Sequence, residues 1–235
     1  MEPTIVAIGG GVLLEDARQQ QIEAYILSLT GKDDPRVCFI GTATGDNPAN
    51  IVRFYSVFTG HRCRPSHLGL IDRKVADLRG FLLSQDVIFV GGGNTNAMLA
   101  VWRQHEVDAI LREAWERGIV LCGGSAGANC WHESSTTDSW GLPLRPLNEG
   151  LGFVPGSFCP HYDVEVTRRL LYREWVSKGL LAAGYACDNG VAVHYEGTSV
   201  KAVVASLPEA RAYRVEQDGF GGYRESEIVP RYLGV

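Results

Sequence analysis

Short apolar runs alternate along the first half of the chain with longer segments whose apolar residues recur at helical spacing. The runs rich in β-branched and aromatic residues predict strands at 4–8, 36–40, 62–68, 86–90 and 119–122. The segments between them predict helices at 15–29, from Pro48 to Phe58, at 73–83 and from 95 to 117, with a break near His105. Strands that alternate with helices in this way indicate an α/β fold with a mainly parallel sheet and helices on both faces.

The second half of the chain has a different pattern. Residues 134–148 are polar and contain prolines, which predicts a loop, whereas 157–161 predict a short strand that ends in a Pro-His pair. A helix is expected at 164–177. Short alternating runs then predict strands or hairpins that complete the sheet at 184–188, 191–195, 199–206, 212–217 and 223–229. Because no linker or repeat interrupts these elements, we expect a single α/β domain over residues 1–235.

Glycine-rich turns follow four of the predicted strands, at 9–11, 41–46, 91–95 and 123–127. The carboxyl ends of parallel strands lie at one edge of a sheet, and open α/β sheets bind ligands at that edge. The four turns therefore predict one functional site.

Composition and charge exclude several classes of protein. The net charge of −5 gives no basic surface for nucleic acid, and no apolar run reaches the roughly 18 residues of a membrane span. The first residues do not resemble a signal peptide. The six cysteines form no C-x-x-C pair, which indicates free thiols and no zinc site. We expect a cytoplasmic protein that requires neither a metal nor a cofactor.

The segment that best indicates chemistry is Gly123-Gly124-Ser125-Ala126-Gly127, directly after a predicted strand. This G-x-S-x-G pattern is typical of a nucleophile elbow, in which a serine occupies a strained strand-to-helix turn and its neighbours must be small. Ser125 is the candidate nucleophile. The alternative is an ordinary glycine-rich turn with a passive serine.

A second glycine turn, residues 91–95, ends in Asn94 and Thr95. It lacks both the third glycine of a dinucleotide-binding loop and the lysine of a P-loop. Beside a serine nucleophile, exposed glycine amides favour an oxyanion hole. A purely structural tight turn is the alternative.

A serine nucleophile requires a base and a group that orients the base. Of the six histidines, only His161 comes just after a strand end, where Pro160 restricts the backbone. His132 is predicted to lie on the helix after the elbow and to point away from Ser125. Asp188 and Asp138 are both candidates for the orienting acid.

These motifs, with Cys159-Pro160-His161 and an acid before a glycine turn, resemble peptidase E, the α-aspartyl dipeptidases and the cyanophycinases. The resemblance implies a class I glutaminase-like, or flavodoxin-like, fold with extra C-terminal strands. It implies Ser125 as nucleophile and His161 as base. It also implies oxyanion amides from Gly92 and Ala126 and a substrate site with Gly93, Asn94 and Thr95.

The same resemblance guides the choice of acid and of specificity residues. Members carry Glu at the position matched to Asp188, and Asp138 matches another acid proposed for that role. We expect Asp188, because the strand before it would hold its backbone rigid. Peptidase E selects an N-terminal aspartate through a basic residue after the histidine, for which Arg168 and Arg169 are candidates.

We therefore expect a serine peptidase or dipeptidase that hydrolyses short peptides through a Ser-His-Asp triad. One alternative is an α/β-hydrolase-type esterase, whose order of Ser, acid and His fits Asp138 but not Asp188. Another is a non-catalytic protein that binds a small molecule on the same fold. The expected partner is a small peptide substrate, and a homodimer is left open.

Overall fold

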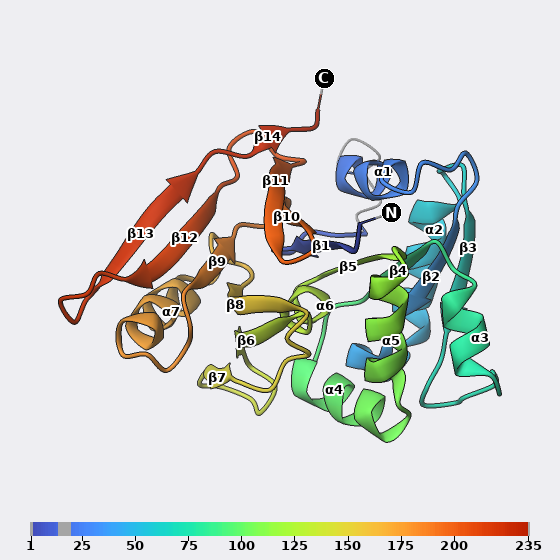
Figure 1. Ribbon diagram of the computed structural model, residues 1–235, viewed down its shortest axis with the longest axis horizontal. Helices are drawn as coiled ribbons and strands as arrows, with labels where there is room; N and C mark the ends of the chain where they lie inside the picture. The colour runs from blue at the N-terminus through green and yellow to red at the C-terminus, as the bar shows by residue number, and fades with distance from the viewer. Residues whose placement is uncertain (1, 14–19, 235) are drawn as a thin grey trace.

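A computed structural model of the chain describes residues 2–13 and 20–234, and Figure 1 shows two sheets side by side. The strands of the first sheet are β1 (Thr4–Ile8), β2 (Arg36–Ile40), β3 (Arg64–Leu68), β4 (Val87–Val90), β5 (Val120–Gly124), β10 (Val191–Glu196), β11 (Ser199–Ala205) and β14 (Arg231–Tyr232). Those of the second are β6 (His132–Thr137), β7 (Arg145–Leu147), β8 (Val154–Cys159), β9 (Gly184–Cys187), β12 (Ala212–Gln217) and β13 (Tyr223–Ile228). The strand orders are β14-β11-β10-β1-β5-β4-β2-β3 and β13-β12-β9-β8-β6-β7.

The helices cover both faces of the first sheet and one side of the second. They are α1 (Gln21–Ser28), α2 (Pro48–Phe58), α3 (Leu78–Leu83), α4 (Thr95–Gln104), α5 (Val107–Glu116), α6 (Ala126–Asn129) and α7 (Val166–Ser177), with a 3-10 turn η2 (Thr42–Thr44). The part of the predicted first helix at 15–19 lies outside the described residues. Helix α7 packs on β12 and β13, whose hairpin projects to the left in Figure 1.

The core of the first sheet follows the alternation of its strands. In β1, Ile5 and Ala7 belong to the cluster that contains the buried residues of α3, α4 and α5, whereas Val6 and Ile8 belong to the cluster with those of α1 and α2. Successive strand residues point to opposite faces, so both faces of a buried strand must be apolar. The predicted α/β class with helices on both faces is confirmed.

Four consecutive strands of the first sheet, β1, β5, β4 and β2, pair in parallel. Their carboxyl ends therefore share one edge, where the predicted glycine turns follow them.

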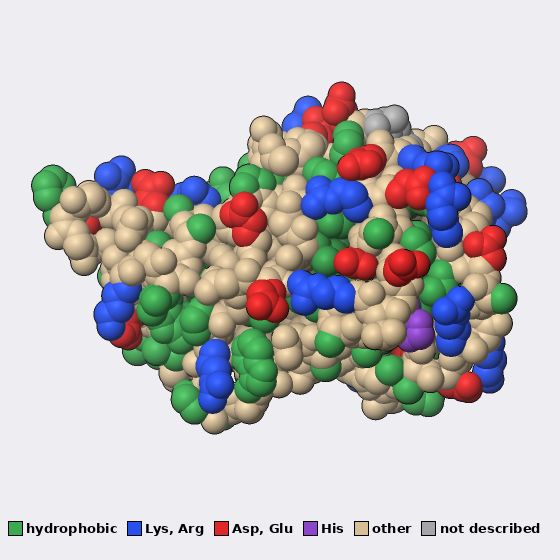
Figure 2. Space-filling model, turned by 60° about the horizontal axis from the view of Figure 1, so that its bottom comes forward, with side chains coloured by type: hydrophobic (Ala, Val, Ile, Leu, Met, Phe, Trp, Pro, Cys, Tyr) green, Lys and Arg blue, Asp and Glu red, His purple; other side chains and the backbone are tan. Residues whose placement is uncertain are grey.

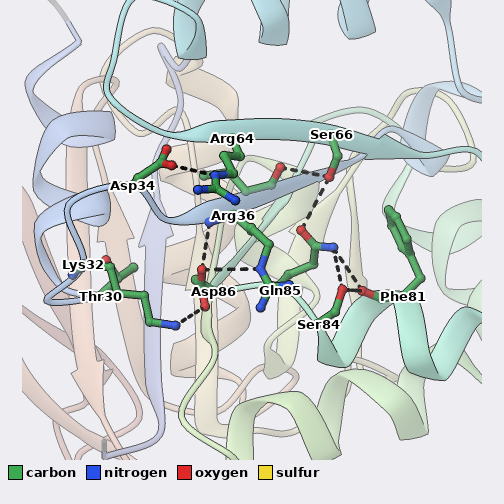
Figure 3. Close-up of polar contacts among 11 residues, drawn as sticks. Thr30, Lys32, Asp34, Arg36, Arg64, Ser66, Phe81, Ser84, Gln85 and Asp86 are labelled. Carbon is green, nitrogen blue, oxygen red and sulfur yellow. Dashed lines mark hydrogen bonds and ion pairs between the residues drawn. The ribbon is translucent and has the colours of Figure 1, made fainter.

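Polar contacts connect these strands near their amino ends, on the side of the sheet away from the glycine turns, as Figure 3 shows. Asp86, just before β4, accepts hydrogen bonds from Lys32 Nζ at 2.6 Å and from Arg36 N at 2.8 Å. Burial opposes ionisation of Asp86, but these bonds outweigh it and hold its pKa below the ordinary value. Next to it, Gln85 lies 3.4 Å from Ser66 Oγ on β3. The amino ends of β2, β3 and β4 are thereby tied together, away from the functional edge.

Two features differ from the sequence prediction. Residues 134–148 do not form a single loop, because they contain most of β6 and all of β7, and β6 is buried between β7 and β8. Some polar β6 side chains form hydrogen bonds, such as Thr136 Oγ1 to Cys159 Sγ at 3.4 Å, whereas the buried Ser134 and Ser135 hydroxyls have no partner among the described residues. In addition, the C-terminal strands are divided between the sheets, with β10 and β11 in the first and β9, β12 and β13 in the second.

The predicted free thiols are confirmed. All six cysteines are unpaired, and Cys38, Cys122, Cys130, Cys159 and Cys187 are buried. Within residues 2–13 and 20–234, no helix combines the length and apolarity that crossing a membrane requires.

Candidate active site

Ser125 occupies the turn between β5 and α6. Its backbone has φ 55° and ψ −114°, a conformation that is rare for a residue with a side chain. The turn brings α6 so close to β4 that a Cβ on Gly123 or Gly127 would lie 2.4 Å or 2.2 Å from Val90 O. These close contacts explain why the residues on either side of Ser125 must be small, as predicted.

His161 follows β8 and also has a positive φ, 55°. Its backbone N–H donates to Gly9 O at 2.9 Å, which fixes the residue against the end of β1. Its Nε2 lies 2.9 Å from Ser125 Oγ. The structure thus brings together the predicted nucleophile and base at hydrogen-bonding distance.

The other ring nitrogen of His161 is bound by Asn189. Asn189 Oδ1 lies 2.8 Å from Nδ1 of His161. When the amide oxygen accepts a hydrogen bond from Nδ1–H, Nε2 carries the lone pair that can receive the Ser125 proton. The backbone of Asn189 is itself held, because its N–H donates to Asp163 Oδ1 at 3.0 Å.

Gly10, in the turn after β1, leaves the space for this histidine–amide pair. A Cβ there would lie 2.1 Å from Asn189 Oδ1 and 2.5 Å from His161 Nδ1. The φ of Gly10 is 147°. The glycine turn after the first strand is therefore part of the site, as its place at the carboxyl edge indicates.

The predicted contact between Asp188 and His161 is wrong. Asp188 Oδ2 accepts a hydrogen bond from Arg211 N at 2.8 Å, and the Asp188 N–H donates to Arg211 O at 3.0 Å. Burial raises the pKa of the Asp188 carboxyl, and the Arg211 N–H opposes this. Asn189 lies in the turn after β9, where its side chain faces His161, whereas the Asp188 carboxylate is bound to the Arg211 backbone.

Asp138, the alternative acid, is exposed and lines the site beside Ser125. It makes no hydrogen bond to His161 in the described part of the chain. The three groups that do connect occur in the order Ser125, His161 and Asn189. This order is not the Ser, acid, His order of α/β-hydrolases.

The candidate oxyanion residues lie next to the serine. A Cβ on Gly92 would come within 3.4 Å of Ser125 Cβ and 3.9 Å of its Oγ, so the Gly92 backbone borders the nucleophile. Ala126 is the first residue of α6, and a first helical N–H has no acceptor within its own helix. Both positions are compatible with donation to an oxyanion, a role that stays a prediction.

A pocket of about 310 Å³ opens in front of Ser125. Its lining consists of Gly93, Asn94, Ser125, Asp138, Ser139, His161, Glu165 and Arg168. The Asn94 side chain accepts from Ala97 N at 2.8 Å as the cap of α4 and donates to Ser139 O at 2.8 Å. Asn94 therefore holds the loop that forms one wall. Thr95, also predicted to bind substrate, is buried and is not a lining residue.

The two candidate arginines differ in position. Arg168 is only 4% exposed and lines the pocket, where its Nε donates to Glu165 Oε2 at 2.9 Å and its Nη1 to Thr136 O at 3.1 Å. Within the described residues its Nη2 has no hydrogen-bond partner. Arg169 is not a lining residue, because it donates to Glu225 Oε1 at 2.7 Å.

His132 does not lie on a helix as expected, because α6 ends at Asn129 and His132 begins β6. It points away from Ser125 as predicted, toward Ala128 O at 3.0 Å and the Tyr195 hydroxyl at 3.2 Å. Burial lowers its pKa to about 4.

Sequence reasoning missed three residues of the site, namely Asn189, Ser139 and Glu165. Asn189 lies with Gly190 in the turn between β9 and β10, and no periodicity of the sequence there indicates that its side chain meets His161. Ser139 and Glu165 carry no local signal, because folding brings their segments to the pocket.

The fold and the Ser125–His161 pair define an α/β protein whose site lies at the carboxyl edge of parallel strands. Residues 5–203 match the family described as peptidase family S51, and the chain belongs to this family and is a peptidase. It is 46% identical over 211 residues to YgaJ of Bacillus subtilis (strain 168), an uncharacterized peptidase, covering 90% of this chain and 91% of the relative.

Other similarities are more limited in extent or identity. Peptidase E of Shewanella denitrificans is 39% identical over 79 residues, which is 33% of this chain and 34% of that protein. The crystal structure of a peptidase from an acI-B1 Actinobacterium superposes with a TM-score of 0.66 at 18% identity, over 98% of this chain and 95% of that one. This second similarity shows the shared fold.

Proposed function

We propose that this S51 peptidase is a serine peptidase that hydrolyses short peptides through Ser125, His161 and Asn189. The observation that supports the proposal is the 2.9 Å distance between Ser125 Oγ and His161 Nε2 on a strained elbow. Such a pair, with a third group on the far nitrogen of the imidazole, is the arrangement that activates a serine hydroxyl.

The reaction follows from this geometry. Ser125 Oγ attacks the scissile carbonyl carbon as His161 Nε2 takes the hydroxyl proton, and the amides of Gly92 and Ala126 bind the oxyanion. His161 then gives the proton to the leaving amine, and the C–N bond breaks. Water hydrolyses the acyl-serine by the same steps. Asn189 keeps Nδ1 protonated throughout, as the asparagine of Cys-His-Asn proteases does.

An N-terminal aspartate is the proposed preference, in line with the resemblance to peptidase E. Arg168 supports it, because its guanidinium lines the pocket and its Nη2 remains to bind a carboxylate. Glu165 and Thr136 would hold that guanidinium in position.

A labelling and cleavage experiment tests the proposal. A fluorophosphonate probe should label the wild type and not Ser125→Ala, and mass spectrometry should detect hydrolysis of Asp-Ala or Ala-Ala by the wild type alone. Loss of the nucleophile should lower kcat by about 10⁴-fold or more. Equal hydrolysis by the folded Ser125→Ala protein would disprove a serine mechanism, and the absence of labelling and hydrolysis in both would favour a non-catalytic binding role.

A further inference from the structure

An apolar groove of about 750 Å³ lies beside the catalytic pocket. We call it the apolar groove, and its lining consists of Leu142, Pro143, Leu144, Val164, Glu165, Val166 and Thr167. Leu142 is 84% exposed, Val164 60% and Val166 71%. Figure 2 shows hydrophobic side chains gathered on this side of the molecule, over α7 and β7. Within the described chain, no side chain covers these three residues.

The apolar groove continues directly from the catalytic pocket. Glu165 lines both cavities, at the start of α7. On the facing side, Asp138 and Ser139 line the catalytic pocket, and Leu142 lines the groove a few residues later in the same loop. Because both walls run from one cavity to the other, a molecule bound at Ser125 can extend into the groove.

The two cavities differ in chemistry. The catalytic pocket presents Arg168, Asn94 and two carboxylates to its occupant, whereas the groove presents leucine, valine and proline side chains apart from Glu165 and Thr167. The proposed function places the side chain of the N-terminal residue in the polar pocket, near Arg168. The residue after the scissile bond is then the part of the substrate that the groove receives.

We propose that the apolar groove is the subsite for an apolar side chain on the leaving residue of the peptide. The inference rests on the proposed peptidase function and adds the identity of the second residue. Burying a Leu side chain against Leu142, Val164 and Val166 removes apolar surface of both partners from water. An apolar pocket that gains a few methylene groups changes kcat/KM by roughly tenfold or more. We therefore expect X-Leu peptides to be cleaved about ten times more efficiently than X-Ala peptides.

The test measures kcat/KM for the pairs Asp-Leu and Asp-Ala, and Ala-Leu and Ala-Ala, so that it does not depend on the first residue. Two variants, Leu142→Ser and Val166→Thr, change exposed groove residues, and Val52→Thr changes a residue of α2 that is 66% exposed outside the groove. The ratio of kcat/KM for the Leu peptide to kcat/KM for the matching Ala peptide should fall toward 1 in both groove variants. It should stay at the wild-type value in Val52→Thr. Thermal melts confirm that each variant is folded.

Several results would overturn the inference. A wild-type ratio near 1 with measurable hydrolysis, or a ratio that the groove variants do not change, removes the subsite and leaves the peptidase function intact. A dimer in sedimentation velocity that Leu142→Ser and Val166→Thr dissociate assigns the groove to a second copy of the chain. If neither peptide hydrolysis nor fluorophosphonate labelling occurs, the proposed function fails and the subsite fails with it.

Discussion

Asn189 Oδ1 lies 2.8 Å from Nδ1 of His161, at the position where a carboxylate was expected. The neighbouring Asp188 is turned away and bound to the Arg211 backbone. The imidazole is thus oriented by a neutral amide. A neutral partner fixes the tautomer of the base without adding a negative charge to the site.

Replacement of Asn189 should distinguish the effect of orienting the His161 imidazole from the effect of a negative charge beside it. Asn189→Leu keeps the approximate volume but removes the acceptor, and displacement of the base should lower kcat by roughly 10²-fold. Asn189→Asp restores an acceptor with a negative charge, which favours the imidazolium. It should retain more activity than the Leu variant, and the acidic limb of its pH–rate profile should move to higher pH. Steady-state kinetics from pH 5 to 9 measure both effects, with Asp188→Asn as the control.

The opposite pattern would restore the original assignment. If Asp188→Asn lowers kcat as strongly as Asn189→Leu in folded protein, Asp188 is the orienting acid.

Gly10 is predicted to be required for activity because of the space it leaves. Gly10→Ala puts a methyl group into the position of the His161–Asn189 hydrogen bond and should reduce kcat by roughly 10²-fold. Gly31→Ala is the matched control, because Gly31 also has a positive φ, 62°, and an added Cβ there meets no described atom within 4 Å. Both variants should lose some stability, but only in Gly10→Ala should the rate of labelling by the fluorophosphonate fall. Equal labelling rates would contradict this role for Gly10.

The elbow and its histidine could be predicted because their signals are local. Small residues after a buried strand specify the turn around Ser125, and the strand end with Pro160 identifies His161. The sequence predicts strands near β8, β9, β12 and β13, but it predicts neither β6 and β7 nor the division of the strands into two sheets. The polar strand β6 is buried with the help of partners that only folding brings to it, such as Arg168, which donates to Thr136 O at 3.1 Å.

The choice between Asp188 and Asn189 shows a different limit. Sequence chemistry favours the carboxylate, but Asn189 lies in a turn after β9, and the conformation of that turn decides which of the two adjacent side chains faces the site. The resemblance predicts an acid at Asp188, whereas the residue that meets His161 is the amide Asn189.

The two arginines after His161 should have different effects on specificity. Arg168→Met removes the only arginine that lines the catalytic pocket in the described structure, so any preference for Asp-X over Ala-X should fall by about tenfold or more. Arg169→Met should leave the preference unchanged, because Arg169 is bound to Glu225 outside the pocket. The ratio of kcat/KM for Asp-Ala to kcat/KM for Ala-Ala measures this preference in each variant. A loss of selectivity in Arg169→Met alone would exclude Arg168 from this role.

Glu225 on β13 should make stability depend on acid pH. Its carboxylate accepts hydrogen bonds from Tyr162 Oη at 2.5 Å, Arg169 Nη2 at 2.7 Å and Arg173 Nε at 2.6 Å. Burial alone would raise its pKa, but these donors lower it from an ordinary 4.5 to about 2. A carboxyl with a lowered folded pKa stabilises the protein fully above its unfolded pKa, and this contribution is lost as the pH falls from about 4.5 to 2.

Glu225→Gln should therefore reduce the free energy of unfolding at pH 7 by about 2 kcal/mol, a figure reduced for the partial exposure of the arginines. At pH 3 and below, the difference between wild type and variant should shrink, because protonation removes the same charge from the wild type. Urea denaturation at pH 7, 5, 4 and 3 measures this convergence. Glu174→Gln is the control, since Glu174 forms an exposed pair with Lys178 on α7 and its loss should change little. A difference that stays constant from pH 7 to 3 would show that Glu225 stabilises the protein through packing and not through its charge.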